Sequence, residues 1–164
     1  MTRLLSDADF AVPASERYLE HYVPGAVYRY GTVPVTADAI VEFAGHYDPQ
    51  PFHLENNPSG AFGGLIASGW QTASLMMRVL VDHVISSVAS LGSPGCDELR
   101  WSQPVRPGDE LSVRFEVLEA RRSRSKADRG VVRAQITVLN QRDEPVMSIL
   151  VAMLLLVRPE KTLD

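Results

Sequence analysis

The stretch from Ser68 to Ala89 reads SGWQTASLMMRVLVDHVISSVA, and it decides how the rest of the chain must be arranged. Its apolar residues fall on almost every side of a helix and not along one stripe: Ala73, Leu75, Met76, Met77, Val79, Leu80, Val81, Val84 and Ile85. A helix that is apolar nearly all round is buried by its surroundings. Four polar or charged residues, Gln71, Arg78, Asp82 and His83, interrupt the stretch, so we expect a core helix and not a membrane span.

The chain after this helix has the pattern of a sheet that could cover it. In residues 111–117 (LSVRFEV) apolar and polar side chains alternate, and residues 131–140 (VVRAQITVLN) repeat that period of two. Residues 146–157 (VMSILVAMLLLV) are continuously apolar, which predicts a central strand covered on both faces. Residues 98–105 (ELRWSQPV) are a further predicted strand.

The first half of the chain adds one strand and one helix. Residues 27–35 (VYRYGTVPV) have the composition of a strand, and Thr36 is a good N-cap for a helix over residues 37–47. Residues 1–26 are polar and irregular, so we expect an N-terminal arm. Strands grouped after helices predict an α+β fold, with an antiparallel sheet wrapped around the long central helix.

Length and composition predict a single soluble domain over residues 1–164. The apolar content of 45% and the charged content of 22% are ordinary, and a net charge of −4 gives no footprint for nucleic acid. A single cysteine, Cys96, excludes an internal disulfide and suits a reducing cytoplasm. The N-terminal residues MTRLLSDADF lack the apolar stretch of a signal peptide, so we expect a cytoplasmic location.

Residues 48–53 read DPQPFH and hold two proton-handling side chains, Asp48 and His53, apart by a spacer with two prolines. Pro49 and Pro51 fix their own φ angles and push the residues before them into extended conformations. We therefore expect a loop, not a helix, that holds the carboxylate and the imidazole on one side of a cleft. Such preorganisation is what acid–base chemistry on a bound substrate requires.

Two other readings of this stretch stay open. Aspartate before proline is common in turns, and a histidine in a loop is often simply solvated. His46, Asp48 and His53, with Glu55 nearby, also resemble a set of two histidines and one carboxylate for a metal. The spacing matches no metal signature, and we expect no metal and no cofactor.

A second informative stretch, AFGGLIASGW over residues 61–70, precedes the long helix. Gly63 and Gly64 allow close approach of the backbone, and Ser68 and Gly69 lie where the helix begins. A helix N-terminus presents unpaired N–H groups, so a substrate carbonyl could reach an oxyanion hole there. Alternatively, Ser68 is only an N-cap and the glycines are ordinary loop residues.

Taken together, four segments resemble one known family: YDPQPFHLE, AFGGLIASGW, WSQPVRPGDEL and RRSRSKADRG. In this order and spacing they resemble the MaoC-like acyl dehydratases, which include the (R)-specific enoyl-CoA hydratases. The resemblance covers roughly residues 25–158. It implies the hotdog fold, an antiparallel sheet around a long central helix, and a homodimer or higher homo-oligomer with active sites at the subunit interface. Gln50 stands where the family has asparagine, and Ser68 where a histidine is often found.

The resemblance also implies a reaction and site residues. The family adds water reversibly across the C2=C3 bond of a trans-2-enoyl-CoA thioester. By motif position, Asp48 and His53 would be the catalytic pair. The Gly69 N–H would bind the thioester oxygen, with Ser68 and Gly64 beside the substrate.

Arg121, Arg122, Arg124 and Lys126 are the basic cluster of the sequence and are candidates for binding the phosphates of coenzyme A. The alternative is a solvated hairpin tip between two strands.

Three functions remain in view. The first is an acyl-CoA hydratase or dehydratase. The second is a hotdog thioesterase, which would direct water at the carbonyl, and the third is a non-catalytic acyl-CoA-binding module. The Asp48 and His53 pair argues against the last two, because neither of them needs separate groups that serve C2 and C3. We expect no nucleic-acid or membrane partner.

Overall fold

The computed structural model describes residues 4, 5, 10 and 12–160 of the 164-residue chain. The elements in chain order are β1 Leu4–Leu5, the 3-10 helices η2 Ala14–Glu16 and η3 Leu19–His21, β2 Val27–Pro34, α1 Ala37–Tyr47, α2 Pro51–Leu54, α3 Gly69–His83, β3 Gly95–Trp101, β4 Glu110–Arg122, β5 Arg129–Leu139 and β6 Pro145–Leu156.

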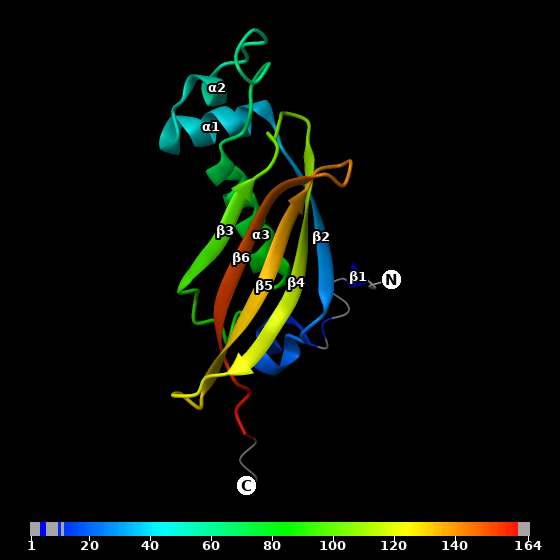
Figure 1. The fold of residues 1–164 in the computed structure, drawn as a ribbon, viewed down its shortest axis with the longest axis vertical. Coiled ribbons are helices and arrows are strands. Elements are labelled where there is room, and N and C mark those ends of the chain that lie inside the picture. The colour runs from blue at the N-terminus through cyan, green and yellow to red at the C-terminus, as the bar shows by residue number, and fades with distance from the viewer. Residues whose placement is uncertain (1–3, 6–9, 11, 161–164) are drawn as a thin grey trace.

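The strands form one six-stranded sheet in the order β1-β2-β4-β5-β6-β3. β1 is parallel to β2, and the other neighbours are antiparallel. The long helix α3 lies against one face of the sheet, and α1 and α2 lie together at one end (Figure 1). The predicted α+β arrangement of an antiparallel sheet around a long helix is confirmed.

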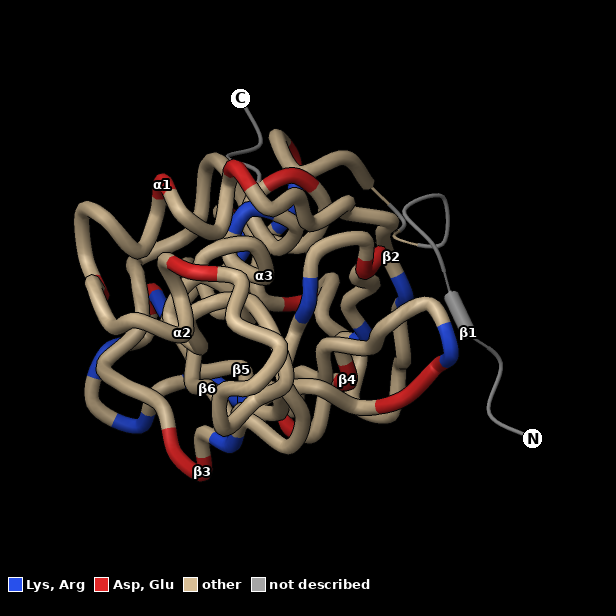
Figure 2. The backbone as a smooth tube through the Cα atoms, turned by 90° about the horizontal axis from the view of Figure 1, so that it is seen from above, with Lys and Arg blue, Asp and Glu red and all other residues tan. Residues whose placement is uncertain are grey.

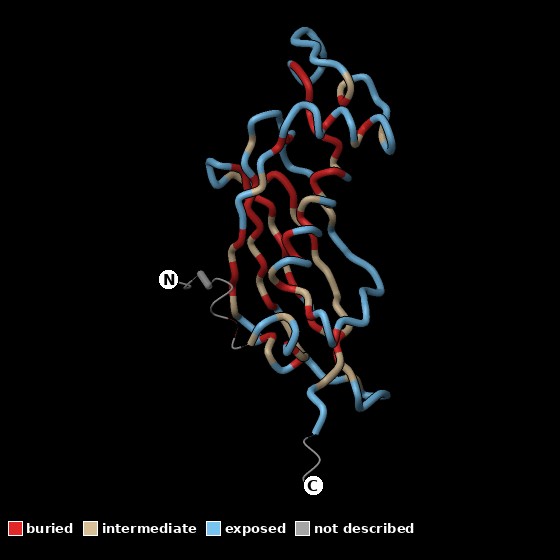
Figure 3. The backbone as a smooth tube through the Cα atoms, turned by 180° about the vertical axis from the view of Figure 1, so that it is seen from behind, coloured by how far each residue is buried: buried red, intermediate tan, exposed pale blue. Residues whose placement is uncertain are grey.

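The core lies between α3 and the sheet, and Figure 3 shows the buried residues concentrated along the strands. The residues with period two in the sequence form its centre: Leu111, Val113, Phe115 and Val117 of β4, and Val132, Ala134, Ile136 and Val138 of β5. Alternation therefore predicts these two strands and their inner faces correctly.

The prediction of a helix buried on all sides is wrong for the single chain. α3 buries Thr72, Met76 and Val79 against the sheet, whereas Met77 and Val81 on its other side are about half exposed. The sheet of one chain covers only one side of the helix, so its outer apolar surface lies in solvent. β6 was likewise expected to be covered on both faces, but most of its second half is only partly buried, because it lies next to the edge strand β3.

The N-terminal arm is more structured than its polar sequence indicates, because Arg17 inserts into the core and caps the C-terminus of α3. Its Nη1 donates to the carbonyl oxygens of His83 and Val84 at 2.8 and 2.9 Å. The guanidinium also stacks over Phe10, with Cζ 3.5 Å from the ring centroid. A cation here satisfies helix carbonyls that have no intrahelical partner and interacts favourably with the helix dipole.

Tyr22 reinforces this cap, because its hydroxyl donates to the Val84 carbonyl at 2.7 Å. Burial raises the pKa of Tyr22 to about 12, so the phenol is protonated at neutral pH and can donate this hydrogen bond. The C-terminal end of α3 is therefore held by two side chains of the N-terminal arm, Arg17 and Tyr22.

We predict that Arg17→Ala lowers the free energy of unfolding by about 2–4 kcal/mol, since it removes a buried charged donor and leaves carbonyls unpaired. Urea denaturation followed by circular dichroism measures this change. Arg78→Ala is the matched control, because Arg78 pairs with Asp82 on the exposed side of the same helix. Equal effects of the two substitutions would contradict the capping role.

Candidate active site

Asp48 and His53 lie next to each other at the end of the molecule that carries α1 and α2. The carboxylate oxygen Oδ2 of Asp48 is 3.3 Å from Nε2 of His53. α1 ends at Tyr47, and Asp48 takes φ −151° and ψ 65°, outside the helical region, because Pro49 follows it. The prolines therefore bring the pair together as the sequence predicted.

The expectation that His53 lies in a loop is wrong. Pro51 starts the four-residue helix α2, and His53 is its third residue. Proline is favoured in the first turn of a helix, where its missing N–H costs nothing. Gln50 before it is extended, with φ −90° and ψ 145°, so the spacer is one extended stretch followed by one helical turn.

The buried ring of His53 is held in one tautomer. Its Nδ1 is 2.8 Å from the backbone carbonyl oxygen of Ile66, which can only accept a hydrogen bond. Nδ1 therefore carries the hydrogen, and in the neutral ring Nε2 has a free lone pair. That lone pair is on the Asp48 side of the ring, where it can accept a proton from a bound molecule.

Asp48 accepts two side-chain hydrogen bonds. The Ser68 hydroxyl donates to Oδ2 at 2.7 Å, and the Gln50 amide donates to Oδ1 at 2.6 Å. These two bonds, first that from Ser68 and then that from Gln50, lower the pKa of Asp48 below its usual value, and His53 adds a smaller effect in the same direction. With a side chain 19% exposed, Asp48 is a carboxylate at neutral pH that remains open to a ligand.

Ser68 also begins α3. Its buried hydroxyl accepts a hydrogen bond from the Trp70 N–H at 3.3 Å, which makes Ser68 the N-cap of the helix. Gly69 is the first helical residue and lines the same cavity as Asp48 and His53. Both readings of this stretch are therefore compatible with the structure: Ser68 is an N-cap, and the cap places a helix N-terminus beside the proton-handling pair.

Trp101, at the end of β3, packs directly on Gly69. Its indole Nε1 donates to the Gly69 carbonyl at 2.9 Å, and a Cβ atom at position 69 would lie 2.5 Å from the ring. Glycine is required here by the close ring and not by an unusual φ angle. Sequence analysis missed Trp101 as a site residue, since 32 residues separate it from its partner.

The cavity beside the pair has a volume of about 360 Å³. Its lining is mostly apolar and aromatic, and comprises Asp48, Phe52, His53, Phe62, Ile66, Ala67, Gly69, Trp70, Thr72, Trp101, Ser102, Gln103, Pro104 and Val105. A largely apolar cavity with a few convergent polar groups is the usual form of a small-molecule site.

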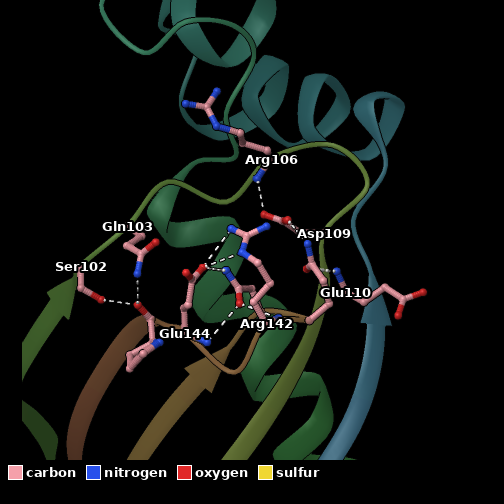
Figure 4. A network of polar contacts seen from close by, with 10 residues as sticks. Ser102, Gln103, Arg106, Asp109, Glu110, Arg142 and Glu144 are labelled. Carbon is pink, nitrogen blue, oxygen red and sulfur yellow. Dashed lines mark hydrogen bonds and ion pairs between the residues drawn. The ribbon is translucent and has the colours of Figure 1, made fainter.

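Hydrogen bonds hold the wall formed by residues 102–105 (Figure 4). Ser102 donates its hydroxyl to the Pro145 carbonyl at 2.8 Å, and the Arg106 N–H donates to Asp109 at 2.8 Å. The Arg106 guanidinium extends the other way and donates to the carbonyl oxygen of Phe62, which lines the opposite wall. Arg106 therefore ties two walls of the cavity together.

Other candidates from the sequence lie elsewhere. Gly64 lines a smaller neighbouring cavity of about 200 Å³ and not the cavity beside Asp48 and His53. Arg121, Arg122 and Arg124 belong to the β4–β5 hairpin, at the end of the sheet away from α1 and α2 (Figure 1). Arg121 pairs with Glu119 and Arg122 with Glu20, so within one chain this cluster does not reach the cavity.

The alternative of a metal site gains no support among the residues that the structure describes. In that part of the chain no three His, Cys, Asp or Glu side chains converge as ligands. The His46 ring turns back to its own helix, with Nδ1 2.8 Å from the Glu42 carbonyl oxygen.

Charge is mixed over the described part of the chain. Figure 2 shows basic and acidic residues interspersed around the backbone. No helix in that part is both long enough and apolar enough to cross a membrane.

The antiparallel sheet against one long helix places the chain in the hotdog class. A double-hotdog protein of Mycobacterium tuberculosis superposes with a TM-score of 0.70 at 16% identity, over 93% of this chain and 48% of that one. The model of the MaoC-like domain matches residues 21–140, so the chain belongs to the MaoC-like dehydratase family.

Solved relatives agree with this assignment. The MaoC-like dehydratase of Rhodospirillum rubrum is 40% identical, with a TM-score of 0.78 over 87% of this chain and 99% of that one. The R-hydratase PhaJ1 of Pseudomonas aeruginosa is 22% identical, with a TM-score of 0.65 over 90% and 94% of the two chains.

We predict that Ser68→Ala raises the pKa of Asp48 toward its ordinary value, because the hydrogen bond that lowers it most is lost. A carboxylate whose pKa is depressed in the folded state adds stability above its unfolded pKa, and this stability is lost as the pH falls through the folded pKa. The variant should therefore lose stability relative to the native protein at neutral pH more than at pH 2–3. Carboxyl carbon NMR titration measures the pKa, with Ser74→Ala, on the exposed side of α3, as the control. An unchanged Asp48 titration would contradict this role of Ser68.

Proposed function

We propose that this protein is a hydratase or dehydratase that adds or removes water across the C2=C3 bond of an enoyl-CoA or 3-hydroxyacyl-CoA thioester. The observation that carries the proposal is the 3.3 Å distance between Asp48 Oδ2 and His53 Nε2. The other ring nitrogen, Nδ1, is hydrogen-bonded to the Ile66 carbonyl oxygen. A carboxylate and an imidazole lone pair then address one point in an apolar cavity.

In this proposal the pair binds one water molecule. His53 Nε2 and Asp48 Oδ2 accept its hydrogens, and one proton passes to the pair as the water oxygen bonds to C3. The pair then returns a proton to C2 on the same side of the substrate, so it ends the reaction in the state in which it began. Acid–base help of this kind contributes about 10²–10⁴-fold to the rate.

The helix N-terminus would stabilise the negative charge that develops on the thioester oxygen. Gly69 lines the cavity at the start of α3, where the first backbone N–H groups have no intrahelical acceptor. Loss of one such donor costs about 10²–10³-fold in related oxyanion sites. Water is the nucleophile, and the two side chains take one proton from it and deliver one to C2, so the proposed reaction uses no metal or bound cofactor.

The family supports this reaction, since the Rhodospirillum rubrum relative is named a MaoC-like dehydratase and PhaJ1 an R-hydratase. Acyl-CoA is the proposed substrate, and the cytoplasm, where its single exposed cysteine stays reduced, is the proposed location.

We further propose that two copies of the chain pair through β3. This strand is an edge of the sheet, all of its residues except Leu99 are exposed, and the described residues offer no partner on its outer side. Unpaired sheet edges readily recruit another strand. The exposed Met77 and Val81 of α3 would be covered at the same time.

The reaction is tested by the loss of enoyl-thioester absorbance with crotonyl-CoA. We predict that Asp48→Asn and His53→Ala each lower kcat by about 10²–10⁴-fold, and that the double variant loses little more, because the two groups act as a unit. His46→Ala is the control, because its ring lies on the exposed end of α1.

Two results would replace the proposal. Release of free thiol without loss of the double bond would identify a thioesterase. Tight binding of acyl-CoA with no turnover in any direction would identify a binding module.

The pairing is tested by the molar mass in solution. We predict a dimer for the native protein at micromolar concentration, and weaker association for Val81→Glu, because a carboxylate would be buried in the interface. Leu118→Glu is the matched control, an equally exposed apolar residue on β4. A native monomer by sedimentation equilibrium would refute the pairing.

A further inference from the structure

A second cavity lies along the same groove between α3 and β3 as the catalytic one. It has a volume of about 440 Å³ and a nearly wholly apolar lining that includes Met76, Leu80, Cys96 and Met153. The catalytic cavity touches the first turn of α3 and the last residue of β3, whereas the second touches later turns of α3 and the first residues of β3. Gly69 and Met76 are seven residues apart, which is about 10 Å along a helix.

Two tryptophans form part of the catalytic cavity where it meets α3 and β3, the two elements that the second cavity also touches. Trp70 and Trp101 both line the catalytic cavity, and neither lines the second one. Their rings meet edge to face, with centroids 5.1 Å apart and an interplanar angle of 77°. The hydrogen bond from Trp101 to the Gly69 carbonyl joins the end of β3 to the start of α3.

Three contacts hold the Trp101 ring in place, although Trp70 and Trp101 are 59% and 42% exposed. The Trp101 ring has a hydrogen bond on one side, the Gly69 backbone against its face and Trp70 at its edge. Edge-to-face aromatic pairs add about 0.5–1.5 kcal/mol beyond the area that they bury. An acyl chain that grows from the catalytic pair toward the second cavity would have to displace this packing.

The lining of the catalytic cavity also limits the charge of the acyl group. Among the described residues that line it none is lysine or arginine, and Asp48 already places one carboxylate there. A second carboxylate on the substrate would be brought near Asp48 with no lysine or arginine in the lining to pair with it, and the nearby Arg106 guanidinium is already bonded to the Phe62 carbonyl. Burying an unpaired charge is costly.

We infer that the Trp70–Trp101 pair closes the catalytic cavity toward the second one, so that the site takes short, uncharged enoyl groups. This inference rests on the proposed function and names its substrate class. Trp101 is thus a specificity-determining residue, and its hydrogen bond to Gly69 gives it a positioning role as well.

The test compares kcat/KM for but-2-enoyl-CoA and oct-2-enoyl-CoA. The native protein should favour the shorter substrate at least tenfold, in line with the ~10-fold or greater effect of a single methylene in a hydrophobic pocket. In Trp101→Ala the ratio of octenoyl to butenoyl activity should rise at least tenfold. In Trp101→Phe, which keeps a ring but loses the indole N–H, kcat should fall while this ratio stays close to the native value.

A matched control separates the two cavities. Met153→Ala enlarges the second cavity, so it should leave the native ratio unchanged if the chain never reaches that space. A native protein that uses octenoyl-CoA as well as butenoyl-CoA, a ratio that Met153→Ala shifts, or equal ratios in Trp101→Ala and Trp101→Phe would each overturn the inference.

The charge limit is tested with two thioesters of the same shape. Mesaconyl-CoA differs from tiglyl-CoA only by a carboxylate in place of a methyl group. We expect at least tenfold lower kcat/KM for mesaconyl-CoA, and equal or higher activity with it would overturn this part.

Calorimetry with the saturated thioesters butanoyl-CoA and octanoyl-CoA separates failure of this inference from failure of the proposed function. If no enoyl thioester is hydrated, the proposed reaction is wrong, but tenfold tighter binding of butanoyl-CoA would still support the limit on chain length. Equal binding, or none, would overturn it.

Discussion

The site depends on the two hydrogen bonds that the Ser68 hydroxyl group makes. This hydroxyl is fully buried, donates its only hydrogen to Asp48 and uses a lone pair to accept the N–H of Trp70. The carboxylate on the α1–α2 connection and the first turn of α3 therefore cannot shift independently. In the proposed reaction, proton transfer and charge stabilisation take place at two points of one substrate, so a rigid link between the groups that serve them is what that chemistry would require.

The sheet is joined to the same place from the other side. Trp101 brings the end of β3 onto Gly69, and the 102–109 connection is fixed by bonds to the β5–β6 turn and to the loop that carries Phe62. The helix, the proline-bounded spacer and the edge strand therefore converge on one residue pair. Each element alone is short or exposed, and their mutual contacts supply the rigidity.

Much of the fold follows from patterns that are local in the sequence. Period-two alternation identifies β4 and β5, and Thr36 caps α1 as predicted, accepting the Ala39 N–H. The two prolines indicate correctly that Asp48 and His53 lie side by side. The four-residue α2 was missed because one helical turn has no periodicity to detect.

The remaining features depend on contacts that sequence patterns do not encode. His53 is oriented by the carbonyl oxygen of Ile66, a group that every residue possesses, so no residue type signals it. Arg17 contacts the end of α3, 66 positions away in the sequence. An arginine in a polar segment predicts a solvent-exposed side chain, so the sequence pattern does not indicate this contact. The apolar circumference of α3 indicates burial but not what covers each side, and the basic residues of the β4–β5 hairpin could be placed only once the sheet was known.

The cap at the C-terminus of α3 has a consequence for where this domain begins and ends. The model of the family's domain matches residues 21–140, and a chain cut at those limits would lose Arg17 at one end and the whole of β6 at the other. β3 pairs only with β6 in the described sheet, so Trp101 would lose its support, and the last carbonyls of α3 would lose their cation. The unit that must fold together is therefore longer than the region that the family model matches, and Arg17 and β6, which complete it, lie outside that region.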